Sequence, residues 1–364
     1  MKHEHILIIR FSALGDVAMT VPVVWALARQ YPHLRITMLS RPMARPFFEG
    51  LAPNVNFMSA DLKGEYHGIR GLNALFRRLA AKQFTAVADL HNVLRSEYLR
   101  LRFNLGRYRV EHIDKHRRRR RKLVTLHSDK RKEQLPTSFQ NYLDVLTKLG
   151  YPVDTEKYHF RSIFETTDNL SLLPSQIGSK PQGDLSLLPP QIGSRPQEQP
   201  WIGIAPFAAH QGKIYPTPLM EKVIEGVLSH RPQARVFLFG RGQQEDELFP
   251  QWVARWPQCC HVGSVLNDMQ HELILMSHLD VMLSMDSANM HLASLVGTPV
   301  VSVWGATHPY AGFMGWNQHP DNAIGLDMDC RPCSVFGQKP CAKGGYPCLY
   351  GIKPETIINK ILSF

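Results

Sequence analysis

Several polar loops in this sequence follow short apolar runs, which is where an α/β protein builds its ligand sites. The first loop, Arg10-Phe-Ser-Ala-Leu-Gly-Asp16, places an acid at the start of a helical pattern. Asp16 can cap that helix by accepting hydrogen bonds from free backbone N–H groups. It can also act as a general base that takes a proton from an acceptor hydroxyl. The spacing by itself favours the cap, and both roles stay open at this stage.

Two loops of the second half could hold a phosphate and a ribose. Pro206 to Lys213 is a run of mainly small residues that ends in a lysine, so it could set backbone N–H groups and one cation against a phosphate. It lacks the Gly-Lys-Ser/Thr order of a Walker loop. In the next loop Gly240 and Gly242 allow close approach of the backbone, and Glu245 could bind ribose hydroxyls. A tight turn followed by a helix cap is the alternative there.

The strongest single pattern is the turn Asp286-Ser-Ala-Asn-Met-His291, which links an apolar run to a helical pattern. The first turn of a helix has unpaired N–H groups that point outward, and such a helix start binds anions. A capped helix that carries a surface histidine is the alternative. We favour a binding role, because successive strands of this half all end in loops that could hold a ligand at one edge of the sheet.

Short apolar runs alternate with amphipathic runs through most of the chain, a pattern that predicts a parallel sheet covered by helices on both faces. Strands are predicted at residues 6–9, 35–39, 55–58, 86–90, 201–205, 234–239, 281–285 and 299–303. Helices are predicted at residues 17–29, 69–82, 93–102, 138–149, 217–230, 267–279, 287–295 and 354–364.

A duplicated segment separates the two halves. The Pro-, Gly-, Ser- and Gln-rich unit at residues 171–182 returns at residues 186–197. Two copies are too few for a repeat array, and the composition suits a flexible linker at a domain junction. We therefore expect a first domain at 1–165, a linker or insertion at 166–199, a second domain at 200–350 and a closing helix at 351–364.

Composition and charge narrow the class of protein. The chain has 364 residues, of which 44% are hydrophobic and 20% are charged, so it should form two globular domains. Its first apolar run is short and lacks a small-residue cleavage site, which predicts a cytoplasmic protein.

The formal net charge is +11, and much of the excess lies in one unbroken run of Arg117, Arg118, Arg119, Arg120, Arg121 and Lys122. A solvated surface loop competes evenly with contact to an anionic membrane face or a phosphorylated acceptor. A nucleic-acid partner is disfavoured.

Six cysteines are present, and a cytoplasmic protein should not use them as a disulfide framework. Cys259 and Cys260 should be ordinary buried or half-buried residues. Cys330, Cys333, Cys341 and Cys348 include one Cys-x-x-Cys pair, which allows a tetrahedral zinc site only as a minor alternative because the second pair is spaced differently.

The motifs at the two ends of the chain resemble glycosyltransferase family 9, the heptosyltransferases of lipopolysaccharide synthesis. The resemblance rests on Ile8-Ile-Arg-Phe-Ser-Ala-Leu-Gly-Asp16 and on the late motif from Ser284 through His291 to Pro309. It implies a GT-B fold of two Rossmann-like domains, with the acceptor on the first and the donor on the second. It implies inverting transfer of a heptose from ADP-heptose, or of a related sugar from another nucleotide-diphosphate donor, to a lipopolysaccharide core or lipid-linked acceptor. It also implies no metal or other cofactor, and a place at the inner face of the inner membrane.

The resemblance also assigns roles to single residues. Asp16 matches the general base, Lys213 matches a lysine that contacts the donor phosphate and sugar, and Glu245 matches a ribose-binding acid. The residues that match the turn around the diphosphate and sugar are Asp286, Ser287, Ala288, Asn289 and His291. The arginines at 117–121 would contact the acceptor or the membrane. This chain departs from the family by having Ala208 and Ala209 where hydroxyl residues are common, which leaves the donor sugar open.

Two other classes of function compete with the transferase. A nucleotide- or polyanion-binding protein without activity would use the same basic run but would leave Asp16 and the late turn without a role. A nucleotide-sugar epimerase or NAD-dependent enzyme would need a glycine fingerprint after the first strand, where only Gly15 is present.

Overall fold

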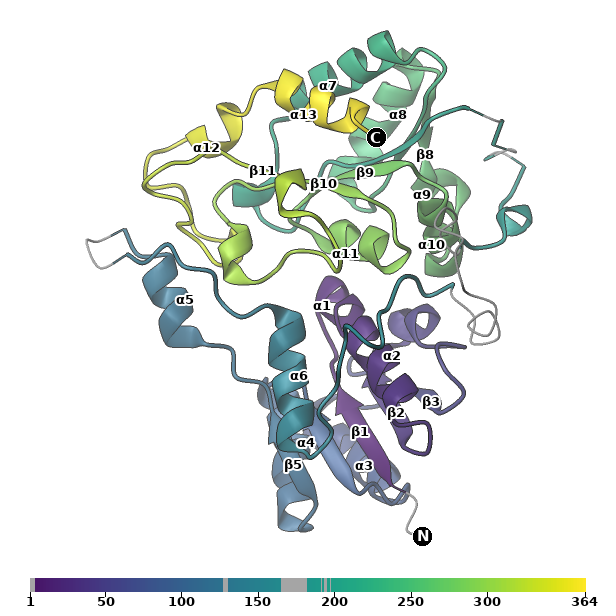
Figure 1. Ribbon diagram of the computed structural model, residues 1–364, viewed down its shortest axis with the longest axis vertical. Coiled ribbons are helices and arrows are strands. Elements are labelled where there is room, and N and C mark those ends of the chain that lie inside the picture. Colours follow the sequence, from purple (N-terminus) through teal and green to yellow (C-terminus); the bar gives the residue numbers. More distant parts are fainter. Residues whose placement is uncertain (1–3, 127–129, 165–181, 191, 193–194, 197) are drawn as a thin grey trace. The chain divides into compact units, whose positions relative to one another are not determined.

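The computed structural model describes residues 4–126, 130–164, 182–190, 192, 195–196 and 198–364, which fold into two compact units (Figure 1). The first unit comprises residues 1–115 and 136–177, and the second comprises residues 116–135 and 178–364. Each unit is built on its own parallel sheet with helices around it, as the alternating sequence pattern predicts. Within the described residues, no helix is long and apolar enough to cross a membrane.

The first unit has a five-stranded parallel sheet in the order β3-β2-β1-β4-β5. Its strands are β1 (His5–Ile9), β2 (Arg35–Ser40), β3 (Val55–Ser59), β4 (Ala86–Asp89) and β5 (Arg109–His112). Its longer helices are α2 (Val21–Gln30), α3 (Gly68–Ala80), α4 (Leu94–Leu105) and α6 (Ser138–Lys148). The centre of the sheet is fully buried, which explains why β1 consists of uninterrupted apolar residues after His5.

The helix predicted at 17–29 is divided in two, α1 (Leu14–Ala18) and α2. Pro22 lies in the first turn of α2, where it has no N–H to give and where its ring would clash with the carbonyl of Ala18 in a continuous helix. The division leaves α1 as a single short turn that carries Asp16.

The second unit has a six-stranded parallel sheet in the order β11-β10-β9-β6-β7-β8. Its strands are β6 (Trp201–Ala205), β7 (Arg235–Leu238), β8 (Cys259–His261), β9 (Val281–Met285), β10 (Val300–Val303) and β11 (Ala323–Ile324). Its longer helices are α7 (Thr217–His230), α8 (Gln243–Arg255), α10 (Met269–Ser277), α11 (Ala288–Leu295) and α13 (Pro354–Leu362).

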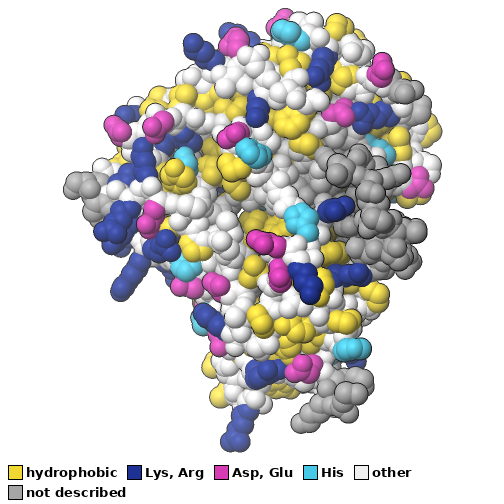
Figure 2. Space-filling view, in the orientation of Figure 1, with side chains coloured by type: hydrophobic (Ala, Val, Ile, Leu, Met, Phe, Trp, Pro, Cys, Tyr) yellow, Lys and Arg dark blue, Asp and Glu magenta, His cyan; other side chains and the backbone are white. Residues whose placement is uncertain are grey.

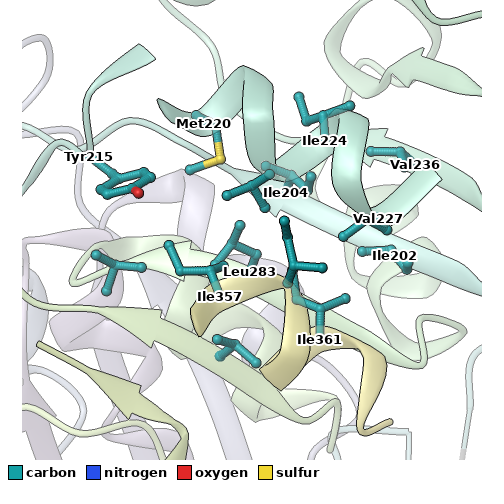
Figure 3. Packing of buried hydrophobic residues seen from close by; sticks show 14 of the residues in the cluster. Ile202, Ile204, Tyr215, Met220, Ile224, Val227, Val236, Leu283, Ile357 and Ile361 are labelled. Carbon is teal, nitrogen blue, oxygen red and sulfur yellow. The ribbon is translucent and has the colours of Figure 1, made fainter. Parts of the chain in front are cut away.

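The core of the second unit joins its first helix to its last. Figure 3 shows Ile202 and Ile204 of β6 beneath α7, with Ile357 and Ile361 of α13 beside them, and all four are fully buried. The two helices approach closely at Gly226, because a Cβ there would lie 2.3 Å from Cδ1 of Ile358. The predicted closing helix is thus part of the core of the second unit.

The arginine run forms a helix, so the alternative of a solvated loop is wrong in its secondary structure. It makes up most of α5 (Arg117–Leu123), and most of its basic side chains are exposed. The segment 116–135 falls within the range expected for the first domain, yet it packs in the second unit. Leu123, Val124 and Leu135 pack against Ala311, and the N–H of Leu135 donates to the carbonyl of Tyr310 at 2.9 Å.

The second copy of the duplicated segment is attached to the second unit where the structure describes it, so it is more than a linker. Ile192 is fully buried. The guanidinium of Arg195 donates to both carboxylate oxygens of Asp280, at 2.7 and 2.6 Å. Residues 171–181, nearly all of the first copy, lie outside the described residues.

Candidate active site

The second unit brings Lys213 and Asp286 together at the point where its strand order reverses. β6 and β9 are neighbours in the sheet although they are far apart in the chain, and from them the strand order runs outward in opposite directions. Ligands of open parallel sheets bind outside such a point, at the carboxyl ends of the strands. Nζ of Lys213 lies 2.9 Å from Oδ2 of Asp286, and the two side chains are only 14% and 4% exposed. The structure thus places together two residues that the sequence patterns had singled out in separate loops.

Close packing of three loops holds Lys213. A Cβ on Gly212 would lie 2.8 Å from the carbonyl oxygen of Gly337, and the carbonyl of Gly212 accepts the N–H of Ala306 at 2.8 Å. Gly337 has φ of +78°, and a Cβ there would lie 2.7 Å from Cγ of Lys213. The loop after β6, the loop after β10 and the loop that contains Gly337 therefore meet around the side chain of Lys213. They come so close that only glycine fits at Gly212 and Gly337.

Arg331 supports the same loops, and no sequence pattern pointed to it. It is 3% exposed, and its guanidinium donates to the carbonyls of Gly305 at 2.6 Å and Trp304 at 2.8 Å. A Cβ on Gly305 would lie 2.6 Å from the carbonyl oxygen of Gly212, so Arg331 fixes the loop against which the Lys213 loop rests. The run at residues 117–121 is visible in the sequence as a cluster of charge, whereas the single Arg331 between Cys330 and Cys333 forms no pattern that predicts a structural role.

The start of α11 presents backbone N–H groups beside the ion pair. Ser287 is the N-cap residue of the helix, and its side chain makes no capping hydrogen bond. Its Oγ instead lies 3.2 Å from Oγ of Ser284. Ala288 and Asn289 are half-buried in the first turn, and His291 is 9% exposed, so the alternative of a surface histidine is wrong. The arrangement suits an anion that takes N–H groups from the helix and charge from Lys213.

Glu245 lies at the end of the neighbouring strand β7, as the third residue of α8. It is half-buried and folds back on the glycine turn, because a Cβ on Gly240 would lie 2.8 Å from its Cγ. Arg241 lies between these two glycines in the sequence, and its Nη2 is 2.6 Å from Oε1 of Glu272. Glu272 is a buried acid that the sequence patterns did not single out. Burial raises the pKa of Glu272 above its ordinary value. The Arg241–Glu272 pair ties the glycine turn after β7 to α10.

The first unit carries Asp16 at the corresponding point of its own sheet, where β1 and β4 are neighbours. Oδ2 of Asp16 lies 2.8 Å from Nη2 of Arg10 and accepts the N–H of Ala13 at 3.0 Å. Arg10 is 7% exposed and donates to the carbonyl of Leu90 at 2.5 Å. Asp16 is therefore not the N-cap itself but the third residue of α1, and its carboxylate accepts the N–H of the N-cap residue Ala13. Its side chain is still 32% exposed, which leaves it open to a substrate.

His91 joins Asp16 at this edge, and it too was missed at the level of sequence. It follows β4, is 8% exposed, and its Nε2 lies 3.3 Å from Oγ of Ser12. Burial, followed by the charges of Arg10 and Lys115, lowers the pKa of His91 to about 3. The imidazole is therefore neutral at physiological pH. The polar residues His91 and Asn92, directly after this strand, were the available signal in the sequence.

The six cysteines are buried or half-buried. All six are free, and Cys259 is buried and Cys260 half-buried, as expected. Burial raises the pKa of Cys348 to about 11 and also raises that of Cys333. Among the described residues, no three His, Cys, Asp or Glu side chains are arranged to hold a metal ion, so the zinc alternative finds no matching geometry.

The arginine run forms a basic surface on the second unit. Figure 2 shows dark blue side chains gathered where Figure 1 draws α5. Two of the arginines have partners within the unit: Nε of Arg119 lies 3.3 Å from Oε1 of Glu133, and the guanidinium of Arg120 lies 4.8 Å from the ring centroid of Phe313. Arg117, Arg118 and Arg121 are exposed.

We expect Lys213 and Asp286 to be energetically coupled. Lys213→Ala leaves the carboxylate of Asp286 buried without its cation, and Asp286→Asn leaves the ammonium without its anion. Urea unfolding of both single variants and the double variant should give a coupling energy of about 0.5–3 kcal/mol. Strictly additive losses would show that the two charges are independent.

His91 should make the folded protein less stable in acid. Its pKa is about 3 in the folded chain against an ordinary value of 6.5, so below pH 6.5 the unfolded chain binds a proton that the folded chain does not. Stability should therefore fall as the pH drops from about 6.5 towards 3. The free energy of unfolding, measured by urea titration at several values between about pH 4.5 and 7.5, should depend less steeply on pH in His91→Gln than in wild type. The control His33→Gln alters an exposed histidine of the same unit and should leave this pH dependence unchanged. An equal slope for wild type and His91→Gln would contradict this assignment.

Comparison with known proteins identifies the family of this chain. The family model of glycosyltransferase family 9 (heptosyltransferase) matches residues 72–342. The lipopolysaccharide core heptosyltransferase OpsX of Haemophilus influenzae is 22% identical over 319 residues, which cover 83% of this chain and 79% of that protein. Lipooligosaccharide heptosyltransferase 2 of Campylobacter jejuni is 25% identical over 129 residues, which cover 35% of this chain and only 40% of that protein.

Solved structures share the fold. The family 9 glycosyltransferase of Veillonella parvula superposes with a TM-score of 0.68 at 18% identity, covering 100% of this chain and 97% of that one. ADP-heptose lps heptosyltransferase II of E. coli superposes with a TM-score of 0.62 at 18% identity, covering 99% of this chain and 98% of that one. E. coli heptosyltransferase WaaC with ADP gives 0.63 at 15% identity, covering 99% of each chain. With a GT-B fold and a family match over most of its length, this chain belongs to glycosyltransferase family 9, the heptosyltransferase family, and is a glycosyltransferase.

Proposed function

We propose that this protein transfers a heptose from ADP-heptose to a lipopolysaccharide core or lipid-linked glycan acceptor, with inversion and without a metal ion. The observation that carries the proposal is the buried Lys213–Asp286 pair beside the uncapped start of α11, at the switch point of the second sheet. The relatives support it, since OpsX is a lipopolysaccharide core heptosyltransferase and WaaC was solved with ADP.

The second unit would bind the donor. Breaking the anomeric bond leaves negative charge on the departing diphosphate, and a fixed cation with aligned N–H groups stabilises that charge. Lys213 supplies the cation, and Asp286 holds its ammonium in place. Ser287, Ala288 and Asn289 supply the helix start, His291 lies one turn further along, and Glu245 would bind the ribose at the next strand. These groups would together take the role that a divalent metal takes in other transferases.

The first unit would bind the acceptor and supply the base. Asp16 would take the proton of the acceptor hydroxyl, whose oxygen then attacks the anomeric carbon from the side opposite the diphosphate. The contacts from Arg10 and Ala13 fix the direction of the carboxylate. His91 is neutral and would orient Ser12 without taking the proton.

The basic surface of α5 would contact an anionic acceptor or the anionic inner face of the inner membrane, and the protein would act from the cytoplasm. Arg117, Arg118 and Arg121 are exposed and could pair with phosphates or acidic sugars. Nucleic acid is not a proposed partner.

Transfer of a different hexose is the second candidate. Ala208 and Ala209 offer no hydroxyl to the phosphate loop, and the late turn has Ser287-Ala288-Asn289 in place of a more common Thr/Ser-Gly order. A thermal-shift screen of ADP-, GDP- and UDP-linked sugars separates the two, since a donor that binds the native protein raises its melting temperature.

Asp16→Asn should keep donor binding and lose most turnover. The amide can still accept the N–H of Ala13, so the helix start survives, but it cannot take a proton. We expect turnover to fall by about 10²–10⁴-fold with an unchanged thermal shift on ADP-heptose. Full activity in this variant would refute the assignment of the base.

Replacing Arg117, Arg118 and Arg121 with Gln should weaken acceptor binding but not donor binding. The three side chains are exposed, so the fold should be kept. The loss should be largest at low ionic strength, because salt screens exposed charges. An unchanged KM for the acceptor at every salt concentration would reject this role of α5.

A further inference from the structure

Helix α4 of the first unit shows a row of leucines to solvent. Leu94, Leu101 and Leu105 are 84%, 57% and 74% exposed. Their separations of seven and four residues place them on one face of the helix. The opposite face is explained by the fold, because Leu99 and Phe103 are fully buried in the core. A single exposed leucine is ordinary, but an aligned row of three indicates a surface that is covered in use.

Helix α3 widens this surface. The side-chain oxygen of Asn73 accepts from the hydroxyl of Tyr98 at 2.7 Å and from Nη1 of Arg102 at 2.6 Å, so this side of α3 meets α4. Ile69 lies one turn before Asn73 on the same helix and is 68% exposed. We name Ile69, Leu94, Leu101 and Leu105 the leucine face.

The rim of the leucine face is basic. Arg95 lies in the first turn of α4 and Arg107 directly beyond its end, and both are exposed. On α3, Arg70 and Arg77 are exposed as well. Glu97 is the one acidic residue of α4, so positive charge prevails along the row. Long arginine side chains can lie along an apolar layer while their charged ends reach a polar one.

This charge distribution decides between possible partners. In a two-fold dimer the same face meets itself, which would bring the arginines of one copy onto those of the other. An anionic lipid surface instead offers acyl chains to the leucines and phosphates to the arginines. We propose that the leucine face is the surface by which this protein binds an anionic membrane.

The position of the leucine face suits the reaction. Leu94 follows His91 by three residues, so the row begins at the edge of the first sheet that carries Asp16. A membrane bound along α4 would bring that edge to the surface where a lipid-linked acceptor is anchored. This consequence rests on the proposed function, whereas membrane binding itself does not.

Vesicle flotation without donor or acceptor tests the proposal directly. Wild-type protein should float with vesicles of phosphatidylethanolamine and phosphatidylglycerol and should float much less with phosphatidylcholine alone. Leu101→Ser/Leu105→Ser changes only exposed side chains, so it should keep its melting temperature and lose roughly tenfold or more in partitioning. The matched control is Leu187→Ser in the second unit, where a leucine 54% exposed should be changed without effect.

Three results would overturn the proposal. The first is that the wild type does not float with anionic vesicles, and the second is that the double variant floats like wild type. The third is that the double substitution halves the native mass measured by light scattering, which would assign the face to self-association. A protein that floats as expected but transfers no heptose would refute the proposed function alone. The Arg117, Arg118 and Arg121 variant keeps the leucine face, so adding Leu101→Ser/Leu105→Ser to it should lower its flotation further, which separates the leucine face from α5.

Discussion

A buried charge is stable only when an opposite charge or a set of hydrogen bonds accompanies it, and both units of this protein build their sites around that constraint. In the second unit Lys213 meets Asp286 at 2.9 Å, and in the first Arg10 meets Asp16 at 2.8 Å. Each pair lies where the strand order of a parallel sheet reverses. The Lys213–Asp286 pair joins the loops that follow β6 and β9, whereas the Arg10–Asp16 pair fixes the first turn of α1. The pairs leave different groups accessible, a cation in one unit and a carboxylate in the other.

That difference matches the division of labour in a transferase. In the proposed reaction, Lys213 and the start of α11 in the second unit would stabilise the departing diphosphate with positive charge and N–H groups. Asp16 of the first unit would be the base for the attacking hydroxyl. The imidazole of His91 at the same edge is neutral.

The surfaces divide in a similar way. The basic helix α5 comes from a segment that leaves the first unit in sequence and packs in the second, against Tyr310 and Ala311. The leucine face of α4 belongs to the first unit and combines apolar side chains with arginines. The electrostatic contact proposed for α5 and the apolar contact proposed for the leucine face thus belong to different units.

The alternating pattern of the sequence was enough to predict the fold class and most elements, because buried parallel strands and amphipathic helices leave periods that do not depend on distant residues. β8 and α8 escaped prediction: β8 is short and lies at a sheet edge, and α8 begins with polar residues and contains Pro250. The motifs also selected Asp16, Lys213 and Asp286 as single residues. Only the tertiary structure showed that Lys213 pairs with Asp286, that Arg331 and Gly337 hold the lysine loop, and that His91 joins Asp16. Those contacts join positions between 26 and 124 residues apart, and local sequence carries no record of such pairings because strand order in a sheet is set by packing of the whole unit.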